Sequence, residues 1–327
     1  MPIRTVLQAI NEALHEEMAE DERVFVLGED VEEGGVFRAT EGLLEKFGRE
    51  RVMDTPLAES SIVGVAIGAA LNGLLPVAEI QFADFILPAM NQIISEAAKL
   101  RYRSAGDFHC PIVIRAPYGG GIRGGLYHSQ CMEALFAHVP GLKVVCPYTP
   151  YDYKGMLKAA IRDPDPVIFF EHKKTYHLVK GEVPERSYTV PIGTAEVRRR
   201  GDDLTVFSYG LALHYCLEAA ERLAREENIQ ATVVDIRTIL PLDRETILEE
   251  AKATGKILIV HEDNLTAGVG AEIAATIAQA AFEYLDAPIM RLCGPDVPAV
   301  PYAQNLEDWY MVNPDKIAAA MRQLAAY

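Results

Sequence analysis

The sequence predicts a two-domain α/β protein with mainly parallel sheets. Short apolar runs rich in β-branched residues alternate with longer helical patterns along the 327 residues. The runs are continuous rather than alternating, as expected for parallel strands covered by helices on both faces. This alternation of strand-like and helix-like segments is lost over residues 173–200 and resumes after them. The chain is long enough to form two hydrophobic cores. We predict an N-terminal domain over residues 1–185, a linker over 186–200 and a C-terminal domain over 201–327.

The expected elements alternate in both halves of the chain. In the first half, strands are expected at Val24–Leu27, Val77–Ile80, Ile112–Arg115, Lys143–Cys146 and Val167–Phe170, and helices at Val6–Glu20, Ser61–Leu71, Met90–Tyr102 and Tyr153–Arg162. In the second half, strands are expected at Leu204–Tyr209, Ala231–Ile236, Lys256–His261 and Ile289–Leu292, and helices at Leu213–Glu226, Arg244–Ala253, Ala271–Tyr284 and Pro314–Ala325. Ligands of open α/β sheets bind at the carboxyl ends of strands, so functional residues are expected in the loops that follow them.

Composition restricts the class of function. The chain has 31 basic and 47 acidic residues, a net charge of −16, which disfavours nucleic acid as a partner. The five cysteines form no Cys-x-x-Cys pair, which is typical of reduced thiols in a cytoplasmic protein rather than of a disulfide frame or zinc site. Residues 60–78 are uncharged, but Asn72-Gly73 and Pro76 interrupt them. We therefore expect a buried helix and a buried strand there, not a membrane span.

A glycine loop, Tyr118–Gln130, follows the strand expected at Ile112–Arg115. Its glycines permit positive φ and the close approach of a bulky ligand, which predicts a flexible approach to His128 within the first domain. The loop matches Gly-x-Gly-x-x-Gly, but the apolar helix and the acidic residue that a dinucleotide site requires do not follow. A nicotinamide-dependent dehydrogenase is thus a weak alternative. His128 itself is either a structural group or a proton donor and acceptor.

Two more segments carry candidate site residues. Glu59 precedes the apolar helix, where its charge either complements the helix dipole or lies against an apolar wall and performs acid–base chemistry. Gln81 and Phe85 follow the strand Val77–Ile80. They either belong to the core or bind a flat heterocycle through an amide hydrogen bond and ring stacking.

Several motifs occur in order over nearly the whole chain. They are Thr55–Glu59, Glu79–Phe85, Arg101–Ser104, Leu126–Gln130, Pro140–Val145 and Asp235–Thr238. Together they resemble the beta subunit of the thiamine-diphosphate-dependent 2-oxo acid dehydrogenases. The resemblance implies a pyrimidine-binding N-terminal domain and a transketolase-like C-terminal domain. It also implies an alpha subunit that holds the diphosphate and magnesium through a Gly-Asp-Gly motif; here Gly201-Asp202-Asp203 is read as a turn.

The resemblance assigns roles to individual residues. Glu59 would hydrogen-bond to the aminopyrimidine ring of thiamine diphosphate and promote its activation. Leu57, Gln81 and Phe85 would line the pyrimidine pocket; several relatives have Tyr at the position of Phe85. His128 would assist reductive transfer of the acyl group to a lipoyl arm.

A potassium ion and two protein partners are also implied. The ion would be held largely by backbone carbonyls, at Ile112, Ala160, Ile161, Asp163 and Asp165. The alternative is that Asp163-Pro164-Asp165-Pro166 is only a turn before a strand. The partners would be an alpha subunit, in a heterotetramer of two alpha and two beta subunits, and the basic subunit-binding domain of a lipoyl acyltransferase. No membrane partner is expected.

The substrate is the least defined part of the prediction. The segments Leu126–Gln130 and Glu79–Phe85 look more like branched-chain enzymes, whereas Glu171-His172 looks more like pyruvate enzymes. We therefore favour branched-chain 2-oxo acids over pyruvate, with acetoin third. A non-catalytic assembly subunit is the alternative of a different class.

Overall fold

The computed structural model describes residues 1–327, whose contacts divide into two compact units. The first unit consists of Met1–Tyr118 and Leu135–Ile192, and the second of Gly119–Ala134 and Gly193–Tyr327. The predicted two-domain α/β class with mainly parallel sheets is confirmed. The glycine loop, expected in the first domain, makes its contacts with the second unit from Gly119 onward. The predicted boundaries at residues 185 and 200 stay predictions.

The first unit is built on a parallel sheet. Its strands, in the spatial order β6-β7-β5-β4-β2-β3, are β6 (Lys143–Val145), β7 (Val167–His172), β5 (Val113–Tyr118), β4 (Leu75–Glu79), β2 (Val24–Gly28) and β3 (Val52–Asp54). Every neighbouring pair among them is parallel. The strands β2, β5 and β7 are buried along their whole length, which explains their continuous apolar sequences. A separate antiparallel pair joins β1 (Ile3–Thr5) to β8 (Lys180–Glu182).

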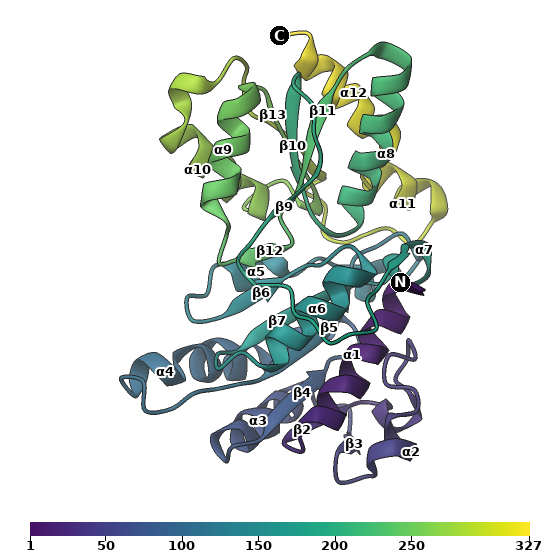
Figure 1. Ribbon diagram of the computed structural model, residues 1–327, viewed down its shortest axis with the longest axis vertical. Coiled ribbons are helices and arrows are strands. Elements are labelled where there is room, and N and C mark those ends of the chain that lie inside the picture. Colours follow the sequence, from purple (N-terminus) through teal and green to yellow (C-terminus); the bar gives the residue numbers. More distant parts are fainter. The chain divides into compact units, whose positions relative to one another are not determined.

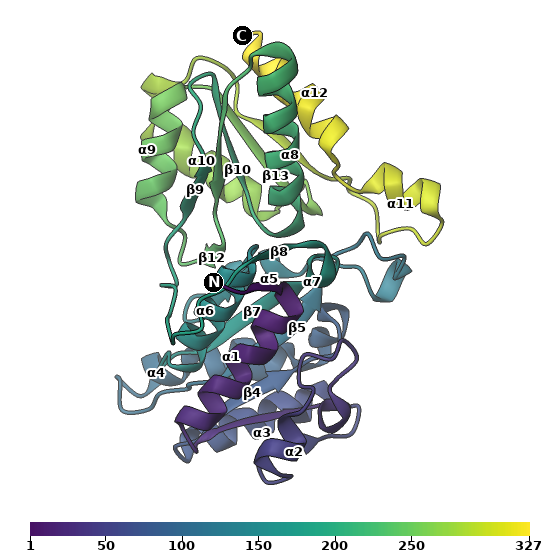
Figure 2. The same cartoon turned by 45° about the vertical axis from the view of Figure 1, so that its right-hand side comes forward.

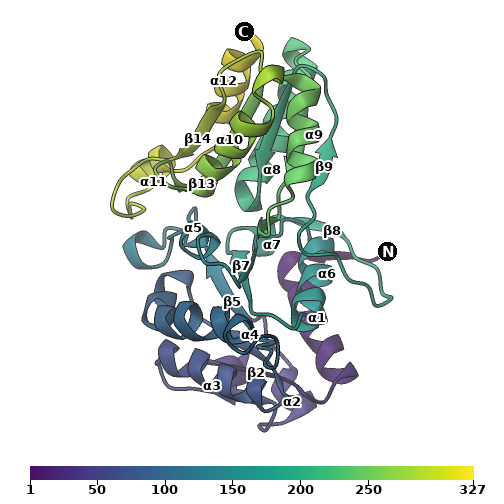
Figure 3. The same cartoon turned by 90° about the vertical axis from the view of Figure 1, so that its left-hand side faces the viewer.

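Helices cover both faces of this sheet. They are α1 (Val6–Glu20), α2 (Leu43–Phe47), α3 (Glu59–Leu71), α4 (Leu100–Arg103), α6 (Pro150–Ile161) and α7 (Thr175–Leu178), and α5 (Glu133–Ala137) begins in the second unit. Figure 3 shows α1 and α6 on one side of β2 and β5, with α3 on the other. The bounds of α1 match the prediction because Thr5 and Gln8 form a capping box, with hydrogen bonds of 3.2 and 3.0 Å.

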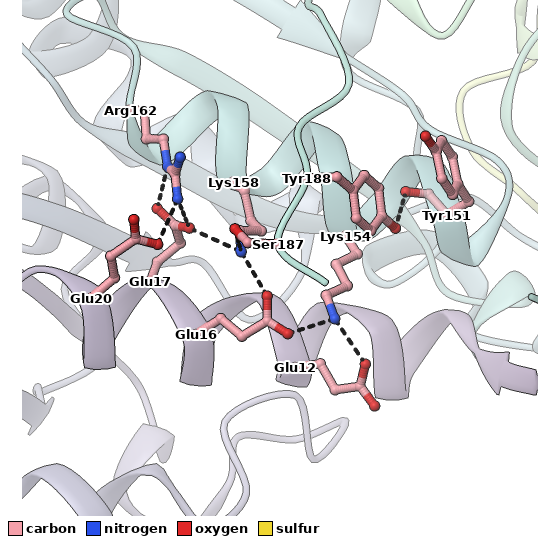
Figure 4. Close-up of polar contacts among 10 residues, drawn as sticks. All are labelled: Glu12, Glu16, Glu17, Glu20, Tyr151, Lys154, Lys158, Arg162, Ser187 and Tyr188. Carbon is pink, nitrogen blue, oxygen red and sulfur yellow. Dashed lines mark hydrogen bonds and ion pairs between the residues drawn. The ribbon is translucent and has the colours of Figure 1, made fainter. Parts of the chain in front are cut away.

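The helices α1 and α6 are joined by a ladder of ion pairs (Figure 4). Lys158 has a fully buried side chain, and its Nζ lies 2.6 Å from a carboxylate oxygen of Glu16 and 3.3 Å from one of Glu17. Arg162 donates to both carboxylate oxygens of Glu17, at 2.8 and 2.7 Å. Buried charges are tolerated only when they are paired in this way, so the ladder fixes how the two helices pack.

Two expectations for the first unit need correction. The segment predicted as one helix at Met90–Tyr102 consists of a π-helix at Asn91–Glu96, a 3-10 helix at Ala97–Lys99 and α4, and a 3-10 helix at Ala83–Ala89 precedes it. The spacing of apolar residues cannot distinguish these helix types, which explains the difference from the prediction. The helix α3, expected to be buried, has an exposed face that includes Gly64, Val65, Gly68 and Leu71.

The second unit has its own sheet, in the order β14-β13-β10-β11-β9. Its strands are β9 (Glu196–Arg199), β10 (Leu204–Ser208), β11 (Ala231–Asp235), β13 (Ile257–Asn264) and β14 (Met290–Gly294), and β12 (Thr238–Leu240) is a further short strand of this unit. All pairs are parallel except β9, which lies antiparallel to β11. This edge strand falls inside the linker predicted at 186–200, because its charged sequence resembles a loop.

Helices again cover both faces of the second sheet. They are α8 (Gly210–Glu227), α9 (Arg244–Thr254), α10 (Val269–Ala280), α11 (Gln304–Tyr310) and α12 (Pro314–Ala325). Figure 1 shows α8 and α12 on one side of β10 and β11, with α9 and α10 on the other. In Figure 2 the helix α11 stands away from β10 and β13. None of the helices combines the length and apolar character needed to cross a bilayer, and all five cysteines are free thiols.

Candidate active site

Polar residues gather where the strands β2, β3 and β4 end. Glu29 and Asp30 follow β2, Glu59 lies a few residues after β3, and Gln81 follows β4. Because these strands are parallel neighbours, their carboxyl ends meet at one edge of the sheet, where ligands of such folds bind. The first unit therefore brings together three of the residues singled out from the sequence, Glu59, Gln81 and Phe85.

Glu59 is the first residue of α3 and is partly exposed. The N–H groups of the first helical turn favour a negative charge at this position. The side chain of Gln81 is oriented by a hydrogen bond of 2.9 Å from its Nε2 to Oδ2 of Asp30. Leu57 is 79% exposed, whereas Phe85 is half-buried and lies 5.8 Å, centroid to centroid, from Phe82. An acid, an amide and two apolar side chains thus lie in the segments that follow neighbouring strands of the sheet.

Glu29 is a candidate site residue that the sequence did not indicate. It is 2% exposed, and its Oε1 has no hydrogen-bond partner. Burial, followed by the charges of Glu59 and Asp30, raises the pKa of Glu29 to about 7. The charge of Glu59 therefore acts on the ionisation of Glu29. The available signal was the position of Glu29, two residues after the end of the strand predicted at Val24–Leu27.

We predict that a Glu29→Gln substitution removes one pH-dependent contribution to stability. Folded Glu29 holds its proton more tightly than the unfolded chain does, so the wild type should lose stability relative to the variant as pH rises from 4.5 to about 7. Above that range the difference should be constant. Denaturant unfolding at a series of pH values measures it, and parallel curves for the two proteins would show that Glu29 titrates normally. A Glu29→Gln, Glu59→Gln protein compared with Glu59→Gln alone should give a smaller dependence.

A buried ion cluster supports the residues at this edge. Arg115, which is fully buried in β5, binds Glu171 through Nε and Nη2 at 2.6 and 2.9 Å, and it also donates to Glu79. The hydroxyl of Tyr176 donates to Glu171 at 2.6 Å. The ring of Phe37 lies between those of Tyr176 and Phe82, at 5.3 and 5.4 Å. These contacts connect the cluster to the aromatic residues beside Phe85.

His128 lies in the second unit, so the predicted site residues are distributed over both units. It follows a short 3-10 helix at Gly125–Tyr127 and is partly exposed. Its neighbours Leu126 and Tyr127 are 52% and 67% exposed. The side chains around His128 therefore present an accessible, partly apolar surface.

The residues predicted to hold potassium are engaged within the protein. Lys143 Nζ lies 2.6 Å from Asp163, and Arg101 lies 2.7 Å from Asp165. The carbonyl of Ile112 accepts the N–H of Val167 at 2.9 Å. Both carboxylates are thus paired with cationic side chains. A potassium ion would therefore have to be bound by carbonyl oxygens that can accept a further contact. The potassium set stays a prediction.

Comparisons with known proteins identify the two domains of the chain. A family model described as the pyrimidine binding domain of transketolase matches residues 4–178, and the transketolase C-terminal domain matches residues 193–317. The chain is 62% identical to the 2-oxoisovalerate dehydrogenase subunit beta of Bacillus subtilis, over the full length of both. It is 48% identical to the pyruvate dehydrogenase E1 component subunit beta of Acholeplasma laidlawii, over 99% of each chain.

The chain is similar to a solved structure titled as a split gene transketolase, an inactive beta4 tetramer. The TM-score is 0.79, and the match covers 98% of both chains. At 24% identity it supports the fold alone. The two family models and the full-length relatives go further, because they match both domains and the order in which they occur. The chain therefore belongs to the family of beta subunits of the thiamine-diphosphate-dependent 2-oxo acid dehydrogenases.

Proposed function

We propose that this chain provides the half of a thiamine-diphosphate site that binds and activates the pyrimidine ring. The observation that carries the proposal is the pair of carboxyl groups at the carboxyl edge of the sheet, Glu59 at the start of α3 and the buried Glu29 with its raised pKa. The oxygen of Glu29 that lacks a partner is a group that a polar heterocycle can satisfy. When bound, thiamine diphosphate supplies the carbon nucleophile that attacks a 2-oxo acid.

The residues of the chain have distinct tasks in this proposal. Glu59 holds a proton on a ring nitrogen of the pyrimidine, which requires a carboxyl group within hydrogen-bond distance. Gln81, held by Asp30, orients the ring through its amide oxygen. Leu57 and Phe85 provide apolar walls that exclude water. His128 donates or accepts the proton that accompanies acyl transfer to a lipoyl group.

A partner subunit is part of the proposal. The exposed face of α3, with Val65 55% exposed, and the neighbouring Leu57 form apolar surface of the kind that marks an interface. We propose an alpha subunit there, which supplies the diphosphate and magnesium site, in a heterotetramer of two subunits of each kind. The charge of −16 suits a basic subunit-binding domain of the acyltransferase component.

Branched-chain 2-oxo acids are the proposed substrates. The full-length relative named for 2-oxoisovalerate is 62% identical, against 48% for the one named for pyruvate. Glu171 and His172, which suggested pyruvate, are both buried, Glu171 in the ion cluster and His172 against the ring of Tyr118. Their identity therefore reflects packing in the first unit and is a poor guide to the substrate.

Reconstitution with an alpha subunit tests this function. The complex should oxidatively decarboxylate 3-methyl-2-oxobutanoate faster than pyruvate and should act on acetoin least, whereas the isolated chain should be inactive because it holds half a site. Turnover is measured with an artificial electron acceptor and, separately, with lipoylated acyltransferase. Activity of the isolated chain would contradict the half-site, and a preference for pyruvate would contradict the substrate assignment alone.

A further inference from the structure

Two buried carboxylates of the second unit bind the backbone of the glycine loop. Glu307, on α11 and 4% exposed, accepts the N–H groups of Gly121 and Arg123 through Oε1 at 2.9 and 3.1 Å. Glu262, in β13 and 5% exposed, accepts the N–H of Gly120 at 2.5 Å. Consecutive N–H groups of a glycine-rich turn converge on anions in this way. The sequence predicted a flexible loop, but the first residues of the glycine loop are hydrogen-bonded to β13 and α11 of the second unit.

The held part of the loop is in direct contact with the backbone of His128. Gly124 follows Arg123, and a Cβ at Gly124 would lie 2.5 Å from the carbonyl oxygen of His128 and 2.9 Å from its Cβ. The N–H of Gly119 donates to the carbonyl of Gln130 at 3.1 Å, which closes the loop around His128. A displacement of Arg123 is therefore transmitted to His128 through a single glycine.

The chain that follows His128 is also hydrogen-bonded within the second unit. Glu133, which is fully buried, accepts a hydrogen bond of 2.9 Å from the hydroxyl of Tyr209. Before His128, the ring of Tyr302 lies 3.2 Å from the position of a Cβ at Gly125. In the sequence, His128 thus lies between residues held by Glu307 and the hydrogen bond of Glu133. The hydrogen bonds to the carboxylate of Glu307 are charge-assisted, which is the stronger kind.

We infer that Glu307 and Glu262 are positioning residues for His128, acting through the backbone of the glycine loop. The inference rests on the role proposed for His128 in acyl transfer. Neither glutamate needs to touch the substrate, because each acts on the loop backbone. Loss of the bonds from Glu307 should allow the loop and His128 to move, which should slow the step that uses His128 and spare the step that uses Glu59.

The test compares two rates in the reconstituted complex. Glu307→Ala should lower acylation of the lipoylated acyltransferase by about 10- to 100-fold, the loss expected when a reacting group is displaced by about an ångström. Decarboxylation measured with an artificial acceptor should stay near the wild-type rate. Glu307→Gln, whose amide oxygen can still accept both N–H groups, should recover most of the acylation. Asp308→Ala, which removes the exposed acid next to it on α11, is the matched control and should change neither rate.

A parallel His128→Ala complex separates this inference from the function on which it rests. If His128→Ala leaves acylation unchanged, the proposed role of His128 is wrong. If His128→Ala slows acylation and Glu307→Ala does not, the role stands and the positioning inference is wrong. Equal losses of both rates in Glu307→Ala, or no recovery in Glu307→Gln, also contradict positioning.

Amide exchange provides a second measurement in case the Glu307→Ala complex fails to assemble. Glu307→Ala removes the acceptor of the hydrogen bonds from the N–H groups of Gly121 and Arg123, whereas Glu307→Gln keeps an oxygen that can accept both. In the full-length chain, peptides covering residues 119–134 should therefore exchange faster in Glu307→Ala than in the wild type, whereas Glu307→Gln should exchange at close to the wild-type rate. Unchanged exchange in this segment would overturn the inference.

Discussion

Replacing Glu59 by Gln should abolish decarboxylation by the reconstituted complex, with a loss of at least about 10²- to 10⁴-fold, the usual contribution of a positioned acid–base group. Gln is nearly isosteric with Glu, so the fold and the positions of Leu57 and Phe85 should persist. What is lost is the ability to hold a proton on the pyrimidine ring. The measurement is the rate of 2-oxo acid decarboxylation at saturating thiamine diphosphate, with cofactor binding followed separately.

The purely structural interpretation of Glu59 makes a different prediction. A carboxylate that only complements the dipole of α3 would contribute about 0.3–1 kcal/mol to stability and nothing to catalysis. Glu45, an exposed acid in the first turn of α2, provides the matched control. Glu45→Gln should cost a similar small amount of stability and leave the rate unchanged. Full activity of the Glu59→Gln complex would favour the non-catalytic assembly subunit.

Replacing Arg115 by Met should destabilise the first unit by about 3–5 kcal/mol, the cost of breaking a buried ion pair from one side. The substitution leaves the buried carboxyl groups of Glu79 and Glu171 without their cation. Denaturant unfolding at neutral pH measures the loss. A control is Arg103→Met, since Arg103 and Glu96 form an exposed pair at 3.6 Å whose removal should cost about 0–1 kcal/mol.

The pH dependence of the Arg115→Met defect is a more specific signature. Burial raises the pKa of Glu79 even with Arg115 present, and removal of the guanidinium would raise it more. A carboxyl group with a raised pKa in the folded state destabilises that state increasingly as pH rises through the interval between the unfolded and folded pKa values. The deficit should therefore be smaller in mild acid than at neutral pH. A deficit independent of pH would mean that lost packing, not unpaired charge, dominates.

Local sequence was enough to predict much of the fold and part of the site. The bounds of α1 were predicted correctly because the helix begins with a local capping box, and the apolar runs of β2, β4 and β7 are characteristic of buried parallel strands. The edge at which Glu59 and Gln81 lie followed from the rule for parallel sheets. Each of these features depends on residues that are close in sequence.

The parts that were missed depend on contacts between distant residues. Glu307 is 184 positions from Arg123, and no local pattern indicates that its carboxylate binds the glycine loop. The significance of Glu29 comes from its burial and from the charge of Glu59, which only the assembled sheet edge determines. The strand β9 was taken for a linker because its stability comes from pairing with β11, not from apolar residues of its own.

The hydrogen bonds of the glycine loop also explain why its Gly-x-Gly-x-x-Gly sequence does not provide a phosphate site in this protein. In a dinucleotide site the N–H groups of the glycine turn remain available for a pyrophosphate. Here those of Gly120, Gly121 and Arg123 are occupied by carboxylates of the same chain. A phosphate would have to displace ligands that are covalently tethered and thus present at a high effective concentration. Glu262 and Glu307 thus compete with phosphate for the N–H groups of this turn. A similar glycine pattern in another protein should be checked for carboxylates of the same chain that bind it.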